Sequence, residues 1–382
     1  MAKLIGEEPP VKRRRMTFNI LMLPDDLLLN CLARISRLHY PIISLVSKRL
    51  RSILTSSELY QTRTLLGRTE SCLYVGLSVH HDSKPLRWFT LCRRPNSSRK
   101  VLVPVSSPHQ SLPEFWPAIA LVGTNVYVIG GLRNKIASSS VMVMDCHSHT
   151  WTEAPSMLVP RQSPFVCVLD GKIYVVGSQK DKTTWMEVFD TKTGNWEFVP
   201  GPSEEICKRA TRYRCIGYGG KVYVTAEKGD TYELNRGRWR RGPLFIDRAG
   251  FSSSFCVIDN VLYRCNSCMI DWYDSEENLW ETVKGLKGLV PFYSGYIHAK
   301  AANHGGKMVI LWEEKVYVNK LPHETKIWCA EITIERRQKE MWGTPDWFEV
   351  VLSTKNERFD QLSYVFFCYS LMNTTGETLF SF

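Results

Sequence analysis

Apolar and polar residues alternate along most of this chain in a pattern that returns every 40 to 49 residues. Each copy begins with a turn and an apolar strand, as at residues 171–177, and ends with a second strand, a tight turn and a tryptophan, as at residues 189–196. The first half recurs around Tyr127, Tyr223 and Tyr263, and the second half recurs at Trp151, Trp239 and Trp280. This alternation predicts short antiparallel strands throughout the repeats.

A repeat of this length that is built only from strands indicates one small antiparallel sheet per repeat. Such sheets stack radially as the blades of a propeller, because one four-stranded sheet cannot bury both of its own faces. We expect the repeated tyrosines on buried inner strands, and the tryptophans on outer strands where they cover the gap between blades. The alternative is an unrelated all-β sandwich whose periodicity arises by chance.

The first part of the chain has helical periodicity instead. Pro24 suits the first turn of a helix, and Asp25 and Asp26 follow where carboxylates favour the helix dipole. The apolar stripe of that helix comprises Leu27, Leu28, Cys31, Leu32 and Ile35. A second helix is expected from Pro41 through Val46, a third from about Ser47 to Leu54, and a fourth over residues 58–66. The apolar residues exceed what these short helices can cover, so another protein is expected to cover Leu21, Leu23, Leu27 and Ile42.

Two segments carry a resemblance to known families. Residues 23–29, Leu-Pro-Asp-Asp-Leu-Leu-Leu, with residues 45–53, Leu-Val-Ser-Lys-Arg-Leu-Arg-Ser-Ile, resemble an F-box, and the glycine, tyrosine-aspartate and tryptophan positions resemble kelch repeats. From residue 18 onward the chain is similar to plant-type F-box/kelch proteins. The resemblance implies docking on a Skp-type adaptor through Leu23, Pro24, Leu27, Leu28, Leu45, Val46 and Leu50. Leu50 departs from the family, which usually has tryptophan there, so we expect a smaller contact at that position.

The chain is therefore divided into a basic tail at residues 1–16, expected to be disordered, a small all-α F-box at 18–66 and an all-β kelch-type propeller at 70–382. Residues 72–91 would form an irregular first blade, residues 117–287 four clear blades, and residues 305–351 a last one. The strand-like segment at 362–369 would close the ring against the first blade. Six blades are favoured, with five or seven as alternatives.

Composition and charge indicate where in the cell the protein is expected and which partners are disfavoured. The chain has 382 residues with a formal net charge of +11, and no stretch approaches the roughly 20 apolar residues that cross a bilayer. Its beginning lacks the apolar core of a secretory signal, so the nucleus or the cytoplasm is the expected location. The tetrad Lys12-Arg13-Arg14-Arg15 is either a nuclear import signal or a solvated tail. Nucleic acid is a disfavoured partner, because no known binding motif accompanies the basic residues.

The sequence holds no catalytic constellation. None of the nucleophile, phosphate-loop or zinc-protease motifs occurs, and sequence-adjacent acids on a strand point to opposite faces. The pair Cys265 and Cys268 has no second pair at metal-binding spacing, and four other cysteines are expected to be buried thiols: Cys146, Cys167, Cys215 and Cys256. We predict no cofactor, no metal and no enzymatic activity. A copper-radical oxidase, which also uses a kelch-type propeller, is the enzymatic alternative.

The leading functional hypothesis is a substrate receptor of a Skp–cullin–F-box ubiquitin ligase, in which the propeller presents loops to an unknown target protein. Loops that follow the first strand of a repeat should emerge on one side of the propeller. They offer weak candidates for target binding at Arg133, Lys135, Lys180, Lys182 and Lys228, whose charge favours an acidic target. The alternative is a non-degradative kelch scaffold or cytoskeletal binding protein.

Overall fold

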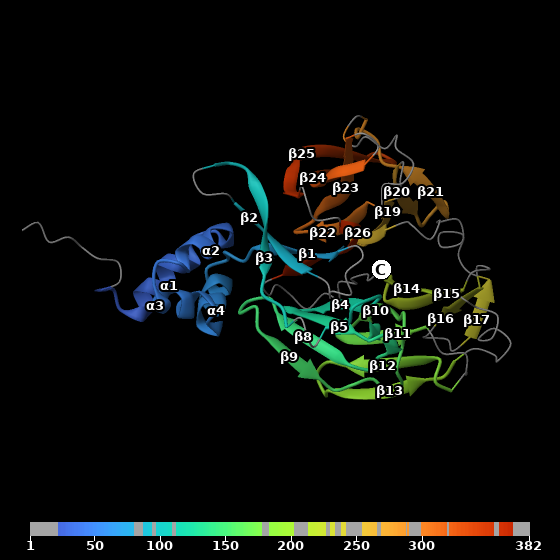
Figure 1. Ribbon diagram of the computed structural model, residues 1–382. Helices are drawn as coiled ribbons and strands as arrows, with labels where there is room; N and C mark the ends of the chain where they lie inside the picture. The colour runs from blue at the N-terminus through green and yellow to red at the C-terminus, as the bar shows by residue number, and fades with distance from the viewer. Residues whose placement is uncertain are drawn as a thin grey trace, which may run out of the picture.

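The computed structural model consists of a small helical unit attached to one side of a ring of β-sheets (Figure 1). It describes residues 22–79, 87–93, 97–108, 112–177, 183–201, 213–226, 230–233, 238–241, 254–265, 269–287, 289, 299–318, 321–354 and 359–369. The basic tetrad and Leu21 lie outside these residues. The last helix ends at Leu65 and the first strand begins at Ser71.

The helical unit comprises α1 (Asp25–Ala33), the 3-10 turn η2 (Arg37–His39), α2 (Tyr40–Ile43), α3 (Lys48–Leu54) and α4 (Ser57–Leu65). Ser47 and Ser56 cap α3 and α4, where their hydroxyls accept hydrogen bonds from the backbone N–H groups of Leu50 and Leu59. The predicted helix from Pro41 to Val46 is wrong in its second half. It ends at Ile43, because the Ser47 cap starts a new helix and leaves residues 44–46 as a turn.

The rest of the described chain forms six four-stranded antiparallel sheets, which we number as blades 1 to 6. Blade 1 contains β26 (Phe359–Tyr369), β1 (Ser71–Val79), β2 (Arg87–Arg93) and β3 (Lys100–Val105). Blade 2 contains β4 (Ala118–Val122), β5 (Asn125–Ile129), β8 (Val141–Asp145) and β9 (Trp151–Ala154). Blade 3 contains β10 (Phe165–Leu169), β11 (Lys172–Val176), β12 (Met186–Asp190) and β13 (Asn195–Val199).

Blade 4 contains β14 (Tyr213–Tyr218), β15 (Lys221–Ala226), β16 (Asp230–Glu233) and β17 (Arg238–Arg241). Blade 5 contains β18 (Ser254–Ile258), β19 (Val261–Cys265), β20 (Ile270–Asp274) and β21 (Leu279–Thr282). Blade 6 contains β22 (Lys300–His304), β23 (Lys307–Val318), β24 (Leu321–Arg337) and β25 (Glu340–Thr354). A separate two-stranded hairpin, β6 (Leu132–Arg133) and β7 (Ile136–Ala137), extends from blade 2.

Each pair of neighbouring blades shares one apolar cluster, and these six clusters close the ring. The cluster between blades 3 and 4 contains Cys167 and Val222, and the one between blades 4 and 5 contains Ile216 and Phe255. The other four join blades 1 and 2, 2 and 3, 5 and 6, and 6 and 1. The predicted helical unit followed by a six-bladed propeller is therefore confirmed. Each sheet buries both of its faces between two neighbours.

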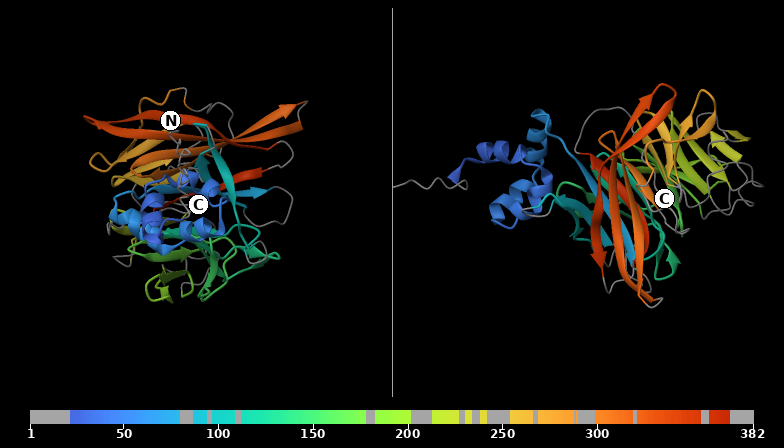
Figure 2. Two further views of the ribbon diagram at one scale, coloured as in Figure 1. Left: turned by 90° about the vertical axis from the view of Figure 1, so that its left-hand side faces the viewer. Right: turned by 90° about the horizontal axis from the view of Figure 1, so that it is seen from above.

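The ring is closed by a strand from the end of the chain. β26 pairs antiparallel with β1, with Val365 opposite Val75, so it supplies the inner strand of blade 1 (Figure 2). The predicted closing strand at residues 362–369 is therefore confirmed.

Two repeated signals of the sequence have the structural roles expected of them. The indole N–H of Trp151 on β9 donates to the carbonyl of Ser106, which follows blade 1 (3.0 Å), and the indole N–H of Trp196 on β13 donates to the carbonyl of Pro155, which follows blade 2 (2.8 Å). These outer-strand tryptophans thus bridge neighbouring blades as predicted. In the double glycine that follows β5, Gly131 has a φ of 94°, and a Cβ there would lie 2.7 Å from the carbonyl oxygen of Phe115.

The helical unit docks on the turn between β8 and β9. The Nη2 of Arg37, a buried residue of η2, donates to the carbonyl oxygen of Cys146 (3.0 Å). The ring of Tyr60 from α4 stacks on the imidazole of His147 with the ring centroids 3.7 Å apart. On the propeller side, the hydroxyl of Tyr74 also donates to the Cys146 carbonyl (2.7 Å). Burial at this junction raises the pKa of Tyr60 to about 12 and lowers the pKa of His147 to about 4.

Candidate adaptor-binding face

The face of the helical unit that points away from the propeller is built where α1 and α3 begin (Figures 1 and 2). Pro24 is the N-cap of α1, one position earlier than the predicted first turn, and its carbonyl accepts from the N–H of Leu28. Arg49 in the first turn of α3 reaches across to α1. Its Nη2 lies 2.6 Å from Oδ1 of Asp25 and 2.9 Å from the carbonyl oxygen of Leu23. These contacts hold the two helix starts side by side.

Four of the predicted adaptor-binding residues are exposed on this unit. Leu27 in α1 is 51% exposed, and Leu45 and Val46 in the turn before α3 are 76% and 66% exposed. Pro24 is also exposed and Leu23 is half-buried. Ile42, predicted as a surface that a partner covers, is partly exposed, and Met22, which the sequence did not single out, is largely exposed. Several exposed large apolar side chains on one small unit are typical of a protein-binding surface.

Leu28 and Leu50 have a different position. Both belong to the apolar core of the helical unit, together with Leu32, Leu54 and Leu59. In the free chain these two leucines therefore stabilise the unit rather than face a partner. Leu50, the position at which the sequence departs from the expected tryptophan, packs inside the unit. The exposed apolar side chains Leu45 and Val46 belong to the turn before α3.

The predicted target-binding residues divide into two groups. Arg133 and Lys135 are both exposed and belong to the β6–β7 hairpin, whereas Lys180, Lys182 and Lys228 lie outside the described residues. The hairpin turn has Asn134 and Lys135 at positive φ, 51° and 63°, as tight two-residue hairpins require.

The hairpin lies at the opposite end of blade 2 from the helical unit. The β5–β8 register places Asn125 beside Asp145, next to the turn where the helices dock, and Ile129 beside Val141, next to the hairpin. Ile136 in the hairpin is 71% exposed, and Trp116, which follows the bridge between Phe115 and Leu132, is 56% exposed. Sequence reasoning missed both apolar residues because it assigned apolar side chains to the interior.

Comparisons with known proteins agree with the division of the chain into a helical unit and a propeller. A family model described as F-box domain matches residues 20–62, and one described as FKB95, Kelch-repeats domain, matches residues 88–352. The chain belongs to the plant F-box/kelch-repeat family. It is 59% identical over 365 residues to the putative F-box/kelch-repeat protein At3g43710 of Arabidopsis thaliana, covering 94% of this chain and 95% of that protein.

Two more Arabidopsis thaliana relatives cover nearly all of the same length. The F-box/kelch-repeat protein At4g33900 is 50% identical over 379 residues (94% of this chain, 97% of that protein). The putative F-box/kelch-repeat protein At4g39290 is 45% identical over 351 residues (89% and 94%). Both parts of this F-box/kelch chain, the helical unit and the propeller, are therefore shared with its relatives.

The cysteines and possible metal ligands that the sequence offers were also located in the structure. Cys146, Cys167, Cys215 and Cys256 are buried free thiols, as predicted, and burial raises the pKa of the Cys167 and Cys256 thiols. Cys268 lies outside the described residues. Among the residues that are described, no group of three or more His, Cys, Asp or Glu side chains is arranged to hold a metal ion. None of the described helices is long and apolar enough to span a membrane.

Proposed function

We propose that this F-box/kelch chain is the substrate-recognition subunit of a Skp–cullin–F-box ubiquitin ligase. The observation that supports the proposal is the exposure of three apolar residues, Leu27 in the first turn of α1 and Leu45 and Val46 in the turn before α3. The starts of α1 and α3 lie on the side of the F-box away from the propeller (Figure 1). An adaptor seated there would leave the propeller uncovered. The chain itself would transfer nothing, because its part is to hold a target protein near the ubiquitin-charged enzyme and so raise the local concentration of that target.

We propose that the target binds the propeller rim opposite the F-box, at the β6–β7 hairpin. Exposed Ile136 and Trp116 offer apolar anchors beside the cationic Arg133 and Lys135, a combination that suits an acidic segment with an apolar residue. The hairpin stands on the rigid frame of blade 2, and loops on such frames commonly carry recognition.

The adaptor interaction is tested by calorimetric titration of the full chain with a purified Skp-type adaptor. Replacing Leu45→Asp and Val46→Asp together places two charges in the apolar contact, and we expect binding to weaken by at least about a hundredfold. Because both side chains are exposed, the folded state should keep its stability, which thermal unfolding would verify.

The matched control is Ile136→Asp, an equally exposed apolar residue on the far rim. It should bind the adaptor like the wild type. If folded wild-type protein did not bind, or if the double variant bound equally well, the ligase role would be rejected, and a kelch scaffold that uses the propeller alone would become the function to pursue.

A further inference from the structure

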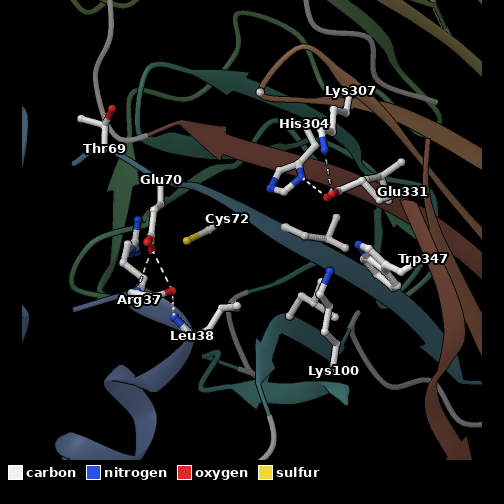
Figure 3. A pocket seen from close by; sticks show the side chains of 15 residues that line it. Arg37, Leu38, Thr69, Glu70, Cys72, Lys100, His304, Lys307, Glu331 and Trp347 are labelled. Atoms are coloured by element: carbon white, nitrogen blue, oxygen red, sulfur yellow. Dashed lines mark hydrogen bonds and ion pairs between the residues drawn. The ribbon is translucent and has the colours of Figure 1, made fainter. Parts of the chain in front are cut away.

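A pocket of about 410 Å³ lies between the F-box and the seam where blade 6 meets blade 1 (Figure 3). The F-box side contributes η2 with Arg37, and the linker before β1 contributes Glu70. The propeller side contributes β3 with Lys100, the end of β22 with His304, and β25 with Trp347. A volume of this size falls within the range of small-molecule sites, about 300–1,000 Å³.

Both carboxylates of the pocket already have partners. Oε2 of Glu70 accepts from the backbone N–H of Arg37 (2.7 Å) and lies 3.3 Å from Nη2 of Arg63. Oε2 of Glu331 lies 2.8 Å from Nδ1 of His304, and Oε1 of Glu331 lies 3.7 Å from Nζ of Lys307. Figure 3 shows these two groups on different sides of the pocket, with Lys100 and Trp347 on a third side.

The Lys100 ammonium and the Trp347 indole N–H have no hydrogen-bond acceptor among the described residues, whereas the backbone N–H of Lys100 donates to Glu349 (2.8 Å). The Lys100 ammonium lies over the Trp347 ring, 3.3 Å from its centroid, and no described carboxylate is within ion-pair distance of it. The indole Nε1 of Trp347 is buried and has no hydrogen-bond partner among the described residues. Burial lowers the pKa of Lys100, although Glu331 and Glu349 oppose this shift. A half-buried cation beside an unpaired N–H favours a ligand that brings one negative charge and acceptor oxygens.

Part of the remaining wall is apolar. Leu73, Leu91 and Val309 line the pocket, and Leu73 and Val309 belong to the buried cluster between blades 6 and 1. An inorganic anion would leave this wall without contact, whereas an organic anion with an apolar body would cover it.

We propose that this pocket binds a small organic monocarboxylate, with the carboxylate at Lys100 and Trp347 and the apolar body against Leu73, Leu91 and Val309. These five ligand contacts all belong to the propeller, while η2 and the linker before β1 line the rest of the pocket. A ligand that binds only the folded chain should raise the melting temperature of the full chain at saturating concentration.

The test compares two probes of the same shape, 3-phenylpropanoate and its neutral amide, by titration calorimetry of the full chain in phosphate-free buffer. A charge-assisted hydrogen bond to Lys100 should make the carboxylate bind at least about tenfold more tightly than the amide. Lys100→Met keeps the apolar stem and should reduce this preference to about twofold or less. Trp347→Phe, which keeps a ring but removes the N–H, should weaken carboxylate binding more than amide binding.

Lys339→Met is the matched control, since Lys339 is an exposed lysine in the turn between β24 and β25. It should bind both probes like the wild type. The proposal is overturned if the wild type binds acid and amide equally, if the preference survives in folded Lys100→Met, or if inorganic phosphate binds more tightly than phenylpropanoate. The comparison of acid with amide on wild-type protein stays decisive even if a variant does not fold. Adaptor titration of the same preparations reports separately on the ligase role.

Discussion

At the scale of single residues, the blades contain a fully buried ion pair between Arg161 and Glu187. Both side chains are 0% exposed, and Nη2 of Arg161 lies 2.9 Å from Oε1 of Glu187. Arg161 also donates to the carbonyls of Gly177, Thr184 and Trp185, and the other Glu187 oxygen accepts from the N–H of Leu158 (2.6 Å). Burial lowers the pKa of Arg161, and Glu187 counters that effect. The charge is tolerated only because each partner satisfies the other.

This arrangement predicts a large cost for Glu187→Gln. The substitution keeps the shape but leaves the arginine buried without its counter-charge, so the free energy of unfolding should fall by about 3–5 kcal/mol. Urea denaturation measures this cost. The control is Lys172→Met, which removes the pair of Lys172 with Asp190 (3.6 Å apart, 47% and 27% exposed) and should cost less than about 1 kcal/mol. Equal losses from the two variants would contradict the role given to the buried pair.

Sequence reasoning found the apolar residues of this chain more readily than its buried charges. The repeated tyrosines and tryptophans indicate inner and outer strands. They stand in segments where apolar and polar residues alternate with a period of two, which follows directly from strand geometry. Arg37, Arg161 and His147 gave no such signal. Charged and polar residues are usually exposed, and only the fold shows that backbone carbonyl groups accept from the two arginines and that Tyr60 stacks on His147.

At the scale of elements, β26 decides whether the ring is closed. It pairs with β1 over the register from Ser71–Tyr369 to Val79–Phe359, and it contacts β22 of blade 6. Without it, β1 would be an unpaired inner edge, and exposed edges of this kind invite association with other chains.

Truncation after Thr354 should therefore abolish the single cooperative unfolding transition and produce oligomers. Calorimetry and light scattering of the truncated chain would measure both effects. Truncation after Tyr369 serves as the control, because it keeps β26 whole. Its unfolding transition and its mass by light scattering should match those of the full chain. A monomeric, cooperatively folding chain that ends at Thr354 would show that the clusters between blades close the ring without this strand.

Elements with weak local signals were the ones that the sequence did not predict. The β6–β7 hairpin is only two residues long on each side, and its turn is Asn-Lys, which lacks the glycine of stronger hairpin signals. The exposed turn at Leu45 and Val46 was assigned to a helix because its apolar residues continue the helical period. In both places the exposed apolar residues, which are candidates for binding, resemble core residues in the sequence.

At the scale of the whole molecule, the F-box and the hairpin lie at opposite ends of blade 2. His147 joins the F-box to that blade, and the nearby His149 contacts Tyr74 of blade 1. Burial, together with the nearby Arg37 charge, lowers the pKa of His147 and His149 to about 4, although Asp145 opposes this effect. His147 stacks on Tyr60, and Nε2 of His149 lies 2.8 Å from the Tyr74 hydroxyl. Both imidazoles are therefore neutral in the folded chain at neutral pH.

The histidine pair predicts how stability depends on acid. Unfolded histidine has a pKa near 6.5, so between about pH 6.5 and pH 4 the unfolded state binds more protons than the folded state, and stability falls as the pH falls through this window. The pair should contribute roughly 1–3 kcal/mol to the loss.

The contribution is measured by urea denaturation at pH 7 and pH 5, with His147→Phe and His149→Gln combined. Phenylalanine keeps a ring for the stack on Tyr60, and glutamine keeps a hydrogen-bonding group near Tyr74, so the variant should fold while losing both titrating imidazoles. We expect its stability to decline less between the two pH values than that of the wild type. An unchanged decline would place the acid sensitivity elsewhere, whereas a reduced one would identify the junction between the F-box and the propeller as the place where acid first acts.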